Sequence, residues 1–325
     1  MFYLEKNHDP RKNSAILAQF TNQLDLSKAI QETEQLFNRL RGNEVSPRQK
    51  EIRHLTGSIS QKMSTTLFRL LSTTANSVDQ VYIKVDSEGN VIPDWKGLLD
   101  AEYSNLHSNL LREVNVVDFG AIGDGKTDNT LAFKKAIGNG RVKVVVPPGV
   151  FITKGIRLPS YTMLVGAGKG VTTIKLHDSV EKGTRLITNE NHWKGNHHLF
   201  VGSLSLDWNV ERLGDVAKTS TWGNHSSCLT YANVVYGWVK DVEGINPGLH
   251  CFDISSTLYN YAGDGYRARG GSKYVWLDNL NGFGFGDDGI TTHHSDYIFI
   301  SRCHMCDPSG RAHKKGFSNS NGIEV

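Results

Sequence analysis

The sequence has few cysteines, almost no net charge and no long apolar run. Its 325 residues contain four cysteines, too few for a disulfide framework, so we expect them to be reduced. Cys303 and Cys306 have the spacing of half a zinc site, but no second pair accompanies them. We therefore expect the cysteines to pack as small apolar side chains inside a sheet.

The charge balance and the lack of apolar stretches exclude further classes of protein. With 36 basic and 33 acidic residues the net charge is +3, so neither nucleic acid nor an anionic membrane is expected as a partner. The N-terminus has no apolar run of signal-peptide length, and no segment approaches the roughly 18 apolar residues of a membrane span. The sequence thus predicts a protein made in the cytoplasm.

Residues 1–113 show the spacing of amphipathic helices. A heptad-like stripe ends at Gly42, and a capping box followed by proline opens a further helical pattern at Ser46. A short hairpin is expected over 81–95 and one more helix over 98–112. This region fits either a helical hairpin packed on itself or a homo-oligomeric coiled-coil stalk. The stripe consists of Leu26, Ile30, Thr33, Phe37 and Leu40.

From Val114 onward the chain is rich in glycine and β-branched residues arranged in short runs. One helix interrupts them at 130–137, capped by Thr127 or Asp128 and closed by Gly138. Many short strands with glycine corners are typical of a sandwich, a barrel or a β-solenoid. Strands are expected at 142–146, 149–152, 163–166 and 173–176.

Internal repetition decides between these three architectures. Segments 236–254, 274–292 and 297–325 align as a strand, a connection of variable length and a second strand, which is the pattern of one coil of a parallel β-helix. His250, Asp288 and Asn321 occupy equivalent positions in this alignment. Because the chain stops inside the last aligned strand and a solenoid end needs a cap, we expect the natural protein to continue.

The alignment also places side chains. It makes Asp253, Thr291 and Glu324 equivalent, and strand alternation puts them in one column on a solvent-exposed sheet face. Neighbouring coils lie about 4.8 Å apart, so the Asp253 and Glu324 carboxylates should be roughly 9 to 10 Å apart, near the roughly 6.5 to 9.5 Å of inverting glycosidases. The same alternation puts six side chains into the core: Phe252, Ile254, Ile290, Thr292, Ile323 and Val325.

Titratable residues crowd into the glycine-rich stretch 281–296, NGFGFGDDGITTHHSD. Asp287 and Asp288 are adjacent and cannot both ionise freely, while His293 and His294 titrate near neutral pH. Such groups suit acid/base catalysis, in which a protonated histidine would stabilise or protonate the leaving oxygen and a carboxylate would activate water. A turn with solvated histidines fits the same residues.

Several motifs resemble the pectate-lyase-like right-handed parallel β-helix superfamily. They are VVDFGAIGDGKTDN at 116–129, AFKKAI at 132–137 and VPPGVF at 146–151. Within that superfamily, residues 115–325, and above all GFGFGDDGITTHHS at 282–295, closely resemble the pre-neck appendage, or tailspike, family of small Bacillus podoviruses. The resemblance implies a mainly β protein, with a right-handed parallel β-helix over 114–325 after the helical region at 1–113.

The resemblance also implies a function. Members of this family are virion proteins that form homotrimers, attach to phage tail or neck proteins through an N-terminal region and degrade host wall teichoic acid. The GDDGI segment at 286–290 is similar to the paired-aspartate motif of polygalacturonases. Their Asn-Thr-Asp and Arg-Ile-Lys motifs are missing, so pectin is not expected as the substrate.

Together these arguments predict a hydrolase that cleaves a phosphodiester or glycosidic bond of a host cell-wall polymer. The sequence assigns no cofactor with certainty, and a divalent cation among the carboxylates is a further candidate that would offset the charge of a polyanionic substrate. A non-catalytic adhesin that stacks the polymer on Trp238, Trp276 and Tyr297 is the alternative. The candidate catalytic residues are Asp287, Asp288, His293, His294, Asp253 and Glu324, followed by Asp207 and Asp264.

Overall fold

The computed structural model describes residues 26–42, 82–86, 90–214, 226–258, 269–310, 312 and 320–325. It divides into two compact units, Met1–Asp100 and Ala101–Val325. The division falls inside helix α4 (Lys96–Ser108). The composition of the sequence places the boundary at 113/114 instead, within the first strand of the second unit, β3 (Arg112–Asn115).

The first unit contains the predicted first helix and hairpin. Helix α2 (Leu26–Gly42) ends at the predicted glycine. Strands β1 (Ile83–Val85) and β2 (Val91–Pro93) pair antiparallel. The helix predicted from Ser46 lies outside the described residues. In the described part of the chain, no helix has the length and apolar character needed to cross a membrane.

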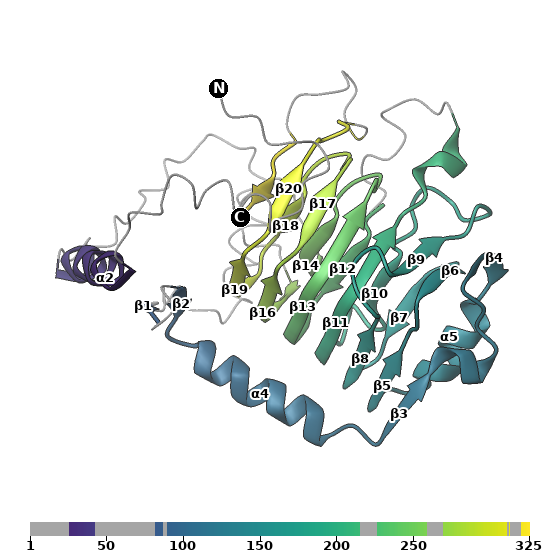
Figure 1. The fold of residues 1–325 in the computed structure, drawn as a ribbon, viewed down its shortest axis with the longest axis horizontal. Coiled ribbons are helices and arrows are strands. Elements are labelled where there is room, and N and C mark those ends of the chain that lie inside the picture. The colour runs from purple at the N-terminus through teal and green to yellow at the C-terminus, as the bar shows by residue number, and fades with distance from the viewer. Residues whose placement is uncertain are drawn as a thin grey trace, which may run out of the picture. The chain divides into compact units, whose positions relative to one another are not determined.

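The second unit is a parallel β-helix, as the fold prediction states, and Figure 1 shows its strands stacked in chain order from β3 to β20. Within the described residues, each coil after the first contributes strands to three rows. The first row runs β3, β5 (Val142–Val145), β8 (Thr162–Val165), β11 (Asn196–Asp207), β13 (Val234–Ile245), β16 (Lys273–Asp278) and β19 (Asp296–Ser301).

The second and third rows complete each coil. The second row contains β4 (Asp124–Asp128), β6 (Gly149–Thr153), β9 (Thr172–Leu176), the C-terminal halves of β11 and β13, β17 (Asn281–Phe283) and β20 (His304–Cys306). The third row contains β7 (Ile156–Leu158), β10 (Ile187–Asn189), β12 (Leu229–Ala232), β14 (Phe252–Leu258), β18 (Ile290–Thr292) and β21 (Ile323–Glu324). Shorter elements are β15 (Arg269–Gly271), antiparallel to β14, and the 3₁₀ helices η1 (Val116–Phe119) and η2 (Val210–Leu213).

A helix packs at the N-terminal end of the solenoid, at the predicted residues (Figure 1). Helix α5 spans Thr130–Ile137 and buries its apolar face in the core. Its N-cap is Asn129, not Thr127 or Asp128. Asp128 still contributes, because its carboxylate accepts the Thr130 amide at 3.0 Å. Gly138 ends the helix, as predicted.

The predicted alignment of coils is confirmed by the strand register. Trp238 of β13 lies opposite Trp276 of β16. Asp253 of β14 lies opposite Thr291 of β18, which lies opposite Glu324 of β21. The third row therefore carries a column of aligned residues one strand spacing apart: Arg157, Thr188, Thr230, Asp253, Thr291 and Glu324.

The predicted exposure of this column is wrong for two of its residues. Asp253 and Thr291 are buried, with exposures of 4% and 0%, and only Glu324 of the three predicted residues is exposed. The alternation of side chains along a strand predicts the face of the sheet on which a side chain lies, but not which other residues cover that face. Arg185, in the connection before β10, lies near enough to Asp253 for their charges to interact.

The predicted core is confirmed in part. Phe252, Ile254 and Ile290 are fully buried, and Thr292 is half-buried. Ile323 and Val325 are exposed, contrary to the prediction, because β21 is the edge strand of its row. A larger share of their surface therefore faces water than in the inner coils.

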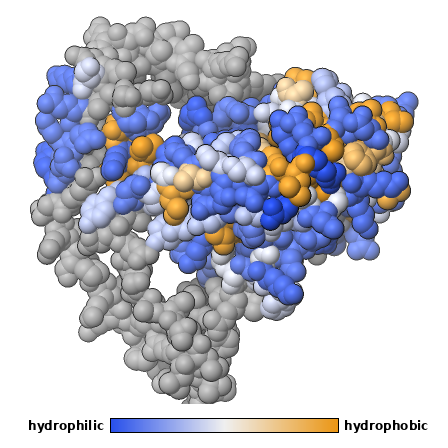
Figure 2. Space-filling model, turned by 90° about the horizontal axis from the view of Figure 1, so that it is seen from below, coloured by the Kyte–Doolittle hydropathy of each residue, from blue (hydrophilic) through white to orange (hydrophobic). Residues whose placement is uncertain are grey.

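The interior is a continuous stack of apolar side chains. Cys228 and Cys251 are free and fully buried in it, as expected, while Cys303 and Cys306 are half-buried. The face shown in Figure 2 is mostly hydrophilic, with small separate apolar patches. The fold therefore gathers its apolar side chains inside the coils.

Left-handed residues lie at the start of five first-row strands, β8, β11, β13, β16 and β19. Tyr161, His198, Tyr236, Tyr274 and Tyr297 have φ between 54° and 61°. Their rings follow one another with centroids 4.5 to 5.5 Å apart, stacked in three pairs and tilted between His198 and Tyr236, and we call this series the aromatic ladder. A left-handed non-glycine residue costs on the order of 1 to 2 kcal/mol, and an aromatic pair contributes about 0.5 to 1.5 kcal/mol that offsets it.

Helix α4 covers part of the outer face of the first row. Tyr103 meets Trp238 edge to face at 5.2 Å, and Glu102 Oε2 lies 2.8 Å from His198 Nε2. The helix is shorter than predicted and ends at Ser108. Its contacts leave Trp238 fully buried.

Gly286 is a position where two coils approach too closely for a side chain. A Cβ there would lie 2.0 Å from the carbonyl oxygen of Gly248 in the preceding coil. The glycine therefore fixes how near the Asp287–Asp288 turn lies to that coil.

Replacing Gly286 with alanine should destabilise the protein by at least about 2 kcal/mol, because the backbones must separate to accept the methyl group. The thermal unfolding midpoint should fall by about 4 to 8 °C. Gly322→Ala is the matched control, since its Cβ would meet only Met305 at 3.7 Å, an ordinary contact. Equal midpoints for the two variants would contradict this account.

Candidate functional site

The glycine-rich turn before β18 places the paired aspartates directly beside the preceding coil. The amides of Gly286 and Asp287 both donate to the carbonyl oxygen of Leu249, at 2.9 and 3.0 Å. The Asp288 amide donates to Nδ1 of His250 at 3.2 Å. Because Nδ1 accepts a hydrogen bond, the ring proton of the neutral His250 lies on Nε2.

His250 completes a compact group with the aspartates. Ligand atoms of His250, Asp287 and Asp288 lie within 4.8 Å of one another, and His250 Nδ1 is 3.7 Å from Asp288 Oδ2. One imidazole and two carboxylates are a donor set that could hold a divalent cation. The sequence candidates omitted His250, although the coil alignment had made it equivalent to Asp288.

Asp288 is a buried carboxyl group that favours its protonated form. Its exposure is 1%, and burial is the main cause that raises its pKa to about 8. A hydrogen bond shared with the Glu324 carboxyl and the charge of Asp287 act in the same direction. The Asn321 amide, which donates to Asp288 Oδ1 at 2.8 Å, opposes them. At neutral pH this group holds a proton to donate.

Asp253 lies on β14, the strand that pairs with β18, and its pKa is raised less than that of Asp288. Burial raises its pKa to about 6, opposed by the charge of Arg185 and a hydrogen bond from Thr230, whose hydroxyl is 3.3 Å from Oδ2. Its other oxygen, Oδ1, is buried without a hydrogen-bond partner in the described part of the chain. Asp253 is therefore mostly ionised at neutral pH, with one oxygen available to accept.

His293 joins this group, but as a neutral imidazole. Its ring nitrogens lie 3.3 and 3.1 Å from the Thr291 hydroxyl, and its ring centroid is 6.1 Å from that of His250. Burial lowers the pKa of His293, so a protonated His293 is not its resting form at neutral pH. His294 is left-handed, with φ of 50°, and its charge acts on His293.

The other carboxylate candidates fall elsewhere. Asp207 forms an ion pair with Lys175 at 3.1 Å in the second row. Asp264 lies outside the described residues. The structure thus gathers Asp287 and Asp288 around His250. Glu324 shares a hydrogen bond with Asp288 and lies in the same column as Asp253.

Comparison with known proteins shows the family. The profile of the rhamnogalacturonase A/epimerase, pectate lyase-like family matches residues 113–321. The chain belongs to this family. The match covers the solenoid and ends just before the last described strand.

Relatives of this pectate lyase-like chain include phage proteins. The phage-related protein YobO of Bacillus subtilis (strain 168) is 51% identical over 254 residues, which are 78% of this chain and 31% of that protein. The preneck appendage protein of Bacillus phage PZA is 43% identical over 212 residues, which are 64% of this chain and 25% of that protein. The chain thus spans about a quarter to a third of the length of these relatives.

A solved structure of a phage protein shares the fold. The crystal structure of the N-terminal fragment of bacteriophage phi29 gene product 12 has a TM-score of 0.59 and 38% sequence identity. The match covers 70% of the pectate lyase-like chain and 37% of that structure.

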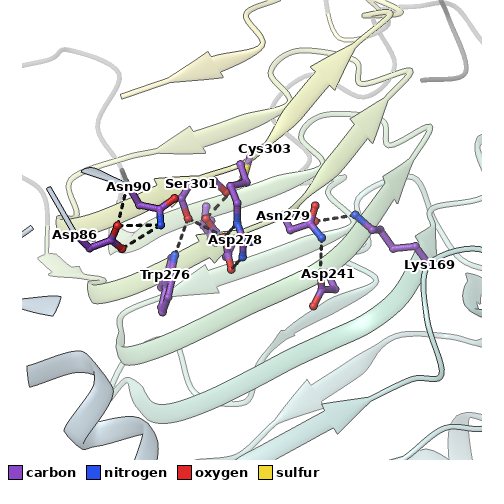
Figure 3. Close-up of polar contacts among 11 residues, drawn as sticks. Asp86, Asn90, Lys169, Asp241, Trp276, Asp278, Asn279, Ser301 and Cys303 are labelled. Atoms are coloured by element: carbon purple, nitrogen blue, oxygen red, sulfur yellow. Dashed lines mark hydrogen bonds and ion pairs between the residues drawn. The ribbon is translucent and has the colours of Figure 1, made fainter. Parts of the chain in front are cut away.

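A second polar cluster, on the first row, contains a buried carboxylate whose oxygens accept hydrogen bonds from neighbouring side chains. Asp278 accepts hydrogen bonds from Ser301 and Arg302, and the Trp276 indole donates to Ser301 at 2.9 Å (Figure 3). The Arg302 side chain and the Ser301 hydroxyl hold the pKa of Asp278 below its usual range, although burial opposes them. This pairing is that of a structural cluster, unlike the environment of Asp253.

The raised pKa of Asp253 predicts how stability depends on pH. Its folded pKa, about 6, lies above the ordinary value of about 3.9, so the folded state binds more protons between these values. Stability should therefore fall as pH rises from about 4 to 6. Asp253→Asn removes this loss, so above pH 6 the variant should gain up to about 3 kcal/mol relative to the parent.

Urea unfolding of the full chain at pH 4 and pH 7 measures this difference. Asp296→Asn, at an exposed residue ion-paired with Lys273, is the control and should follow the parent at both pH values. A difference between Asp253→Asn and the parent that is the same at both pH values would rule out the linkage.

Proposed function

We propose that this chain is the β-helix part of a phage appendage that binds and hydrolyses a host cell-wall polymer of the teichoic acid class. The relatives named as preneck appendage proteins support the biological setting. The observation that carries the chemistry is the pair of buried carboxyl groups on one outer face, with Asp288 protonated and Asp253 ionised at neutral pH.

The two carboxyl groups suit a concerted hydrolysis. Asp288 donates its proton to the leaving oxygen as the bond to phosphorus or to the anomeric carbon breaks. Asp253 accepts a proton from the attacking water, whose oxygen forms the new bond. The products are an alcohol and the hydrolysed polymer end, with the protons of the two aspartates exchanged through solvent afterwards.

The short distance between Asp287 and Asp288 argues against Asp287 as the base. Oxygens of Asp287 and Asp288 lie within 4.8 Å of one another, which is less than the roughly 6.5 Å that an intervening water needs. Asp287 instead helps to keep the Asp288 proton in place through its charge. His250 accepts a hydrogen bond from the Asp288 amide, which helps to hold Asp288, the proton donor, in position.

Asp288→Asn should lower polymer degradation by at least about 10²-fold, because the amide keeps the shape of the side chain but has no acidic proton. Asp287→Asn should cost less, and the double variant little more than Asp288→Asn alone, because the two groups act as a unit. The rate is measured as alcohol or reducing ends released from purified wall polymer. A doubly substituted protein that degrades polymer at the parent rate would refute this assignment.

The pH profile gives a second readout from the same assay. The kcat/KM value of the parent should fall below about pH 6 and above about pH 8, following the two carboxyl groups. Chelator added to the assay tests the cation alternative at His250, Asp287 and Asp288. Acid/base action alone predicts a rate within about twofold of the untreated protein.

A non-catalytic adhesin is the second candidate, favoured by one observation. The aromatic ladder continues through Tyr274 and Tyr297, whose rings stack at 4.5 Å and are half-buried. Trp238 is fully buried, so the prediction that it stacks the polymer is wrong, and Trp276 stacks on Phe299 at 5.3 Å. Polymer that binds without any release of fragments would favour this function.

We further propose that the N-terminal region attaches the chain to phage tail or neck proteins and holds it as a homotrimer in the virion. Sedimentation equilibrium of the full chain should return the mass of three chains. Charge substitution of Leu36, which is 47% exposed on α2, should shift the mass towards one chain if this helix forms the interface. A parent protein that is a monomer at all concentrations would refute the trimer.

A further inference from the structure

Three buried polar atoms on the third row have no hydrogen-bond partner among the described residues. They are Nε of Arg185, Oγ of Ser227 and Oδ1 of Asp253. Ser227 is fully buried and Asp253 is 4% exposed. Folded proteins rarely leave such atoms unsatisfied, and a group of them at one place indicates a partner that binds there.

The strand register places Arg185 and Ser227 at one position in neighbouring coils, and Asp253 lies near enough to Arg185 for their charges to interact. Ile187 of β10 lies opposite Leu229 of β12, which lies opposite Phe252 of β14. Two residues before each of these positions come Arg185, Ser227 and His250, which therefore occupy one position in successive coils. The Leu186 amide bonds the Ser227 carbonyl, and the Cys228 amide bonds the His250 carbonyl, so the register continues through these residues.

Positive charge gathers at the same place. The charges of Asp253 and of Arg157 both act on the Arg185 guanidinium. Arg157 is exposed on β7 and belongs to the column that contains Asp253. The Asp253 carboxylate offsets one of these two positive charges, and an anion bound between the guanidinium groups would offset the other.

We propose that Arg185, Arg157 and Ser227 form a subsite that binds an anionic group of the polymer, either a phosphodiester or a carboxylate. The planar guanidinium groups match the oxygens of either anion, and the Ser227 hydroxyl donates a further hydrogen bond. The subsite rests on the proposed function, because Arg157 lies in the column of Asp253, and Arg185 and Ser227 occupy the position of Asp288 in earlier coils. The subsite binds a part of the polymer that the catalytic residues do not contact.

The spacing of the coils makes this a subsite for a polymer. Arg185 and Asp288 occupy the same position three coils apart, which corresponds to about 14 Å. One small group cannot reach both residues. The bound anion therefore belongs to a neighbouring unit of the chain, and short fragments that lack this unit should bind poorly.

Binding to full-length protein that carries Asp288→Asn tests the subsite apart from catalysis. Two probes are used, a poly(glycerol phosphate) and a polyuronate, to distinguish phosphodiester from carboxylate. Adding Arg185→Gln or Arg157→Gln should weaken binding of the recognised probe by about tenfold or more, with a smaller dependence on salt. Lys175→Gln, which removes one positive charge from the second row, is the matched control and should bind within about twofold of the parent.

Ser227→Ala separates binding from a structural role. Removing a buried hydroxyl without a partner should not lower the thermal midpoint, whereas a ligand site predicts weaker binding of the same probe. The subsite is refuted if neither probe depends on Arg185 and Ser227, or if Lys175→Gln weakens binding equally. Hydrolysis that still requires Asp288 in that case would leave the proposed function intact.

Discussion

The register between successive coils is the constraint on which the rest of this structure depends. Each strand bonds the equivalent strand one coil away, so residues at one position repeat about every 4.8 Å along the solenoid. Close approaches such as Gly286 against Gly248, and the left-handed tyrosines of the aromatic ladder, keep that register from slipping. Chemistry at the site follows, because the register alone places Asp253, Thr291 and Glu324 side by side.

The same register explains why the carboxyl groups of the third row behave unusually. Stacked strands bring acidic residues from different coils together, and their burial removes the water that would stabilise their charges. Asp288 responds by keeping its proton, while Asp253 is partly stabilised by Arg185. Asp278 on the first row is equally buried, yet Arg302 and Ser301 keep it ionised. The identity of the neighbours, and not burial alone, separates the two kinds of cluster.

Much of this arrangement could be predicted from the sequence. Repeated tyrosines and aspartates gave the alignment of coils, and with it the column of Asp253, Thr291 and Glu324, because a parallel solenoid has one simple register. The burial of Asp253 could not be predicted, since it depends on side chains that alternation does not describe, such as Arg185. His250 was visible as the partner of Asp288 in the alignment, but a lone histidine gave no chemical reason to choose it. The neutral state of His293 depends on its burial, which no local pattern shows.

The aromatic ladder has a consequence for how such a protein can change. Each ring packs against the equivalent ring of the next coil, so the ladder fixes the position of every strand that follows it. Connections between rows vary in length, although the one from β17 to β18 is tied to the preceding coil at Gly286. The connection from β9 to β10 spans residues 177–186, whereas that from β18 to β19 spans only 293–295. Insertions in these connections can therefore reshape what borders the third row, and so alter which polymers are accepted, while the spacing of the catalytic groups stays constant.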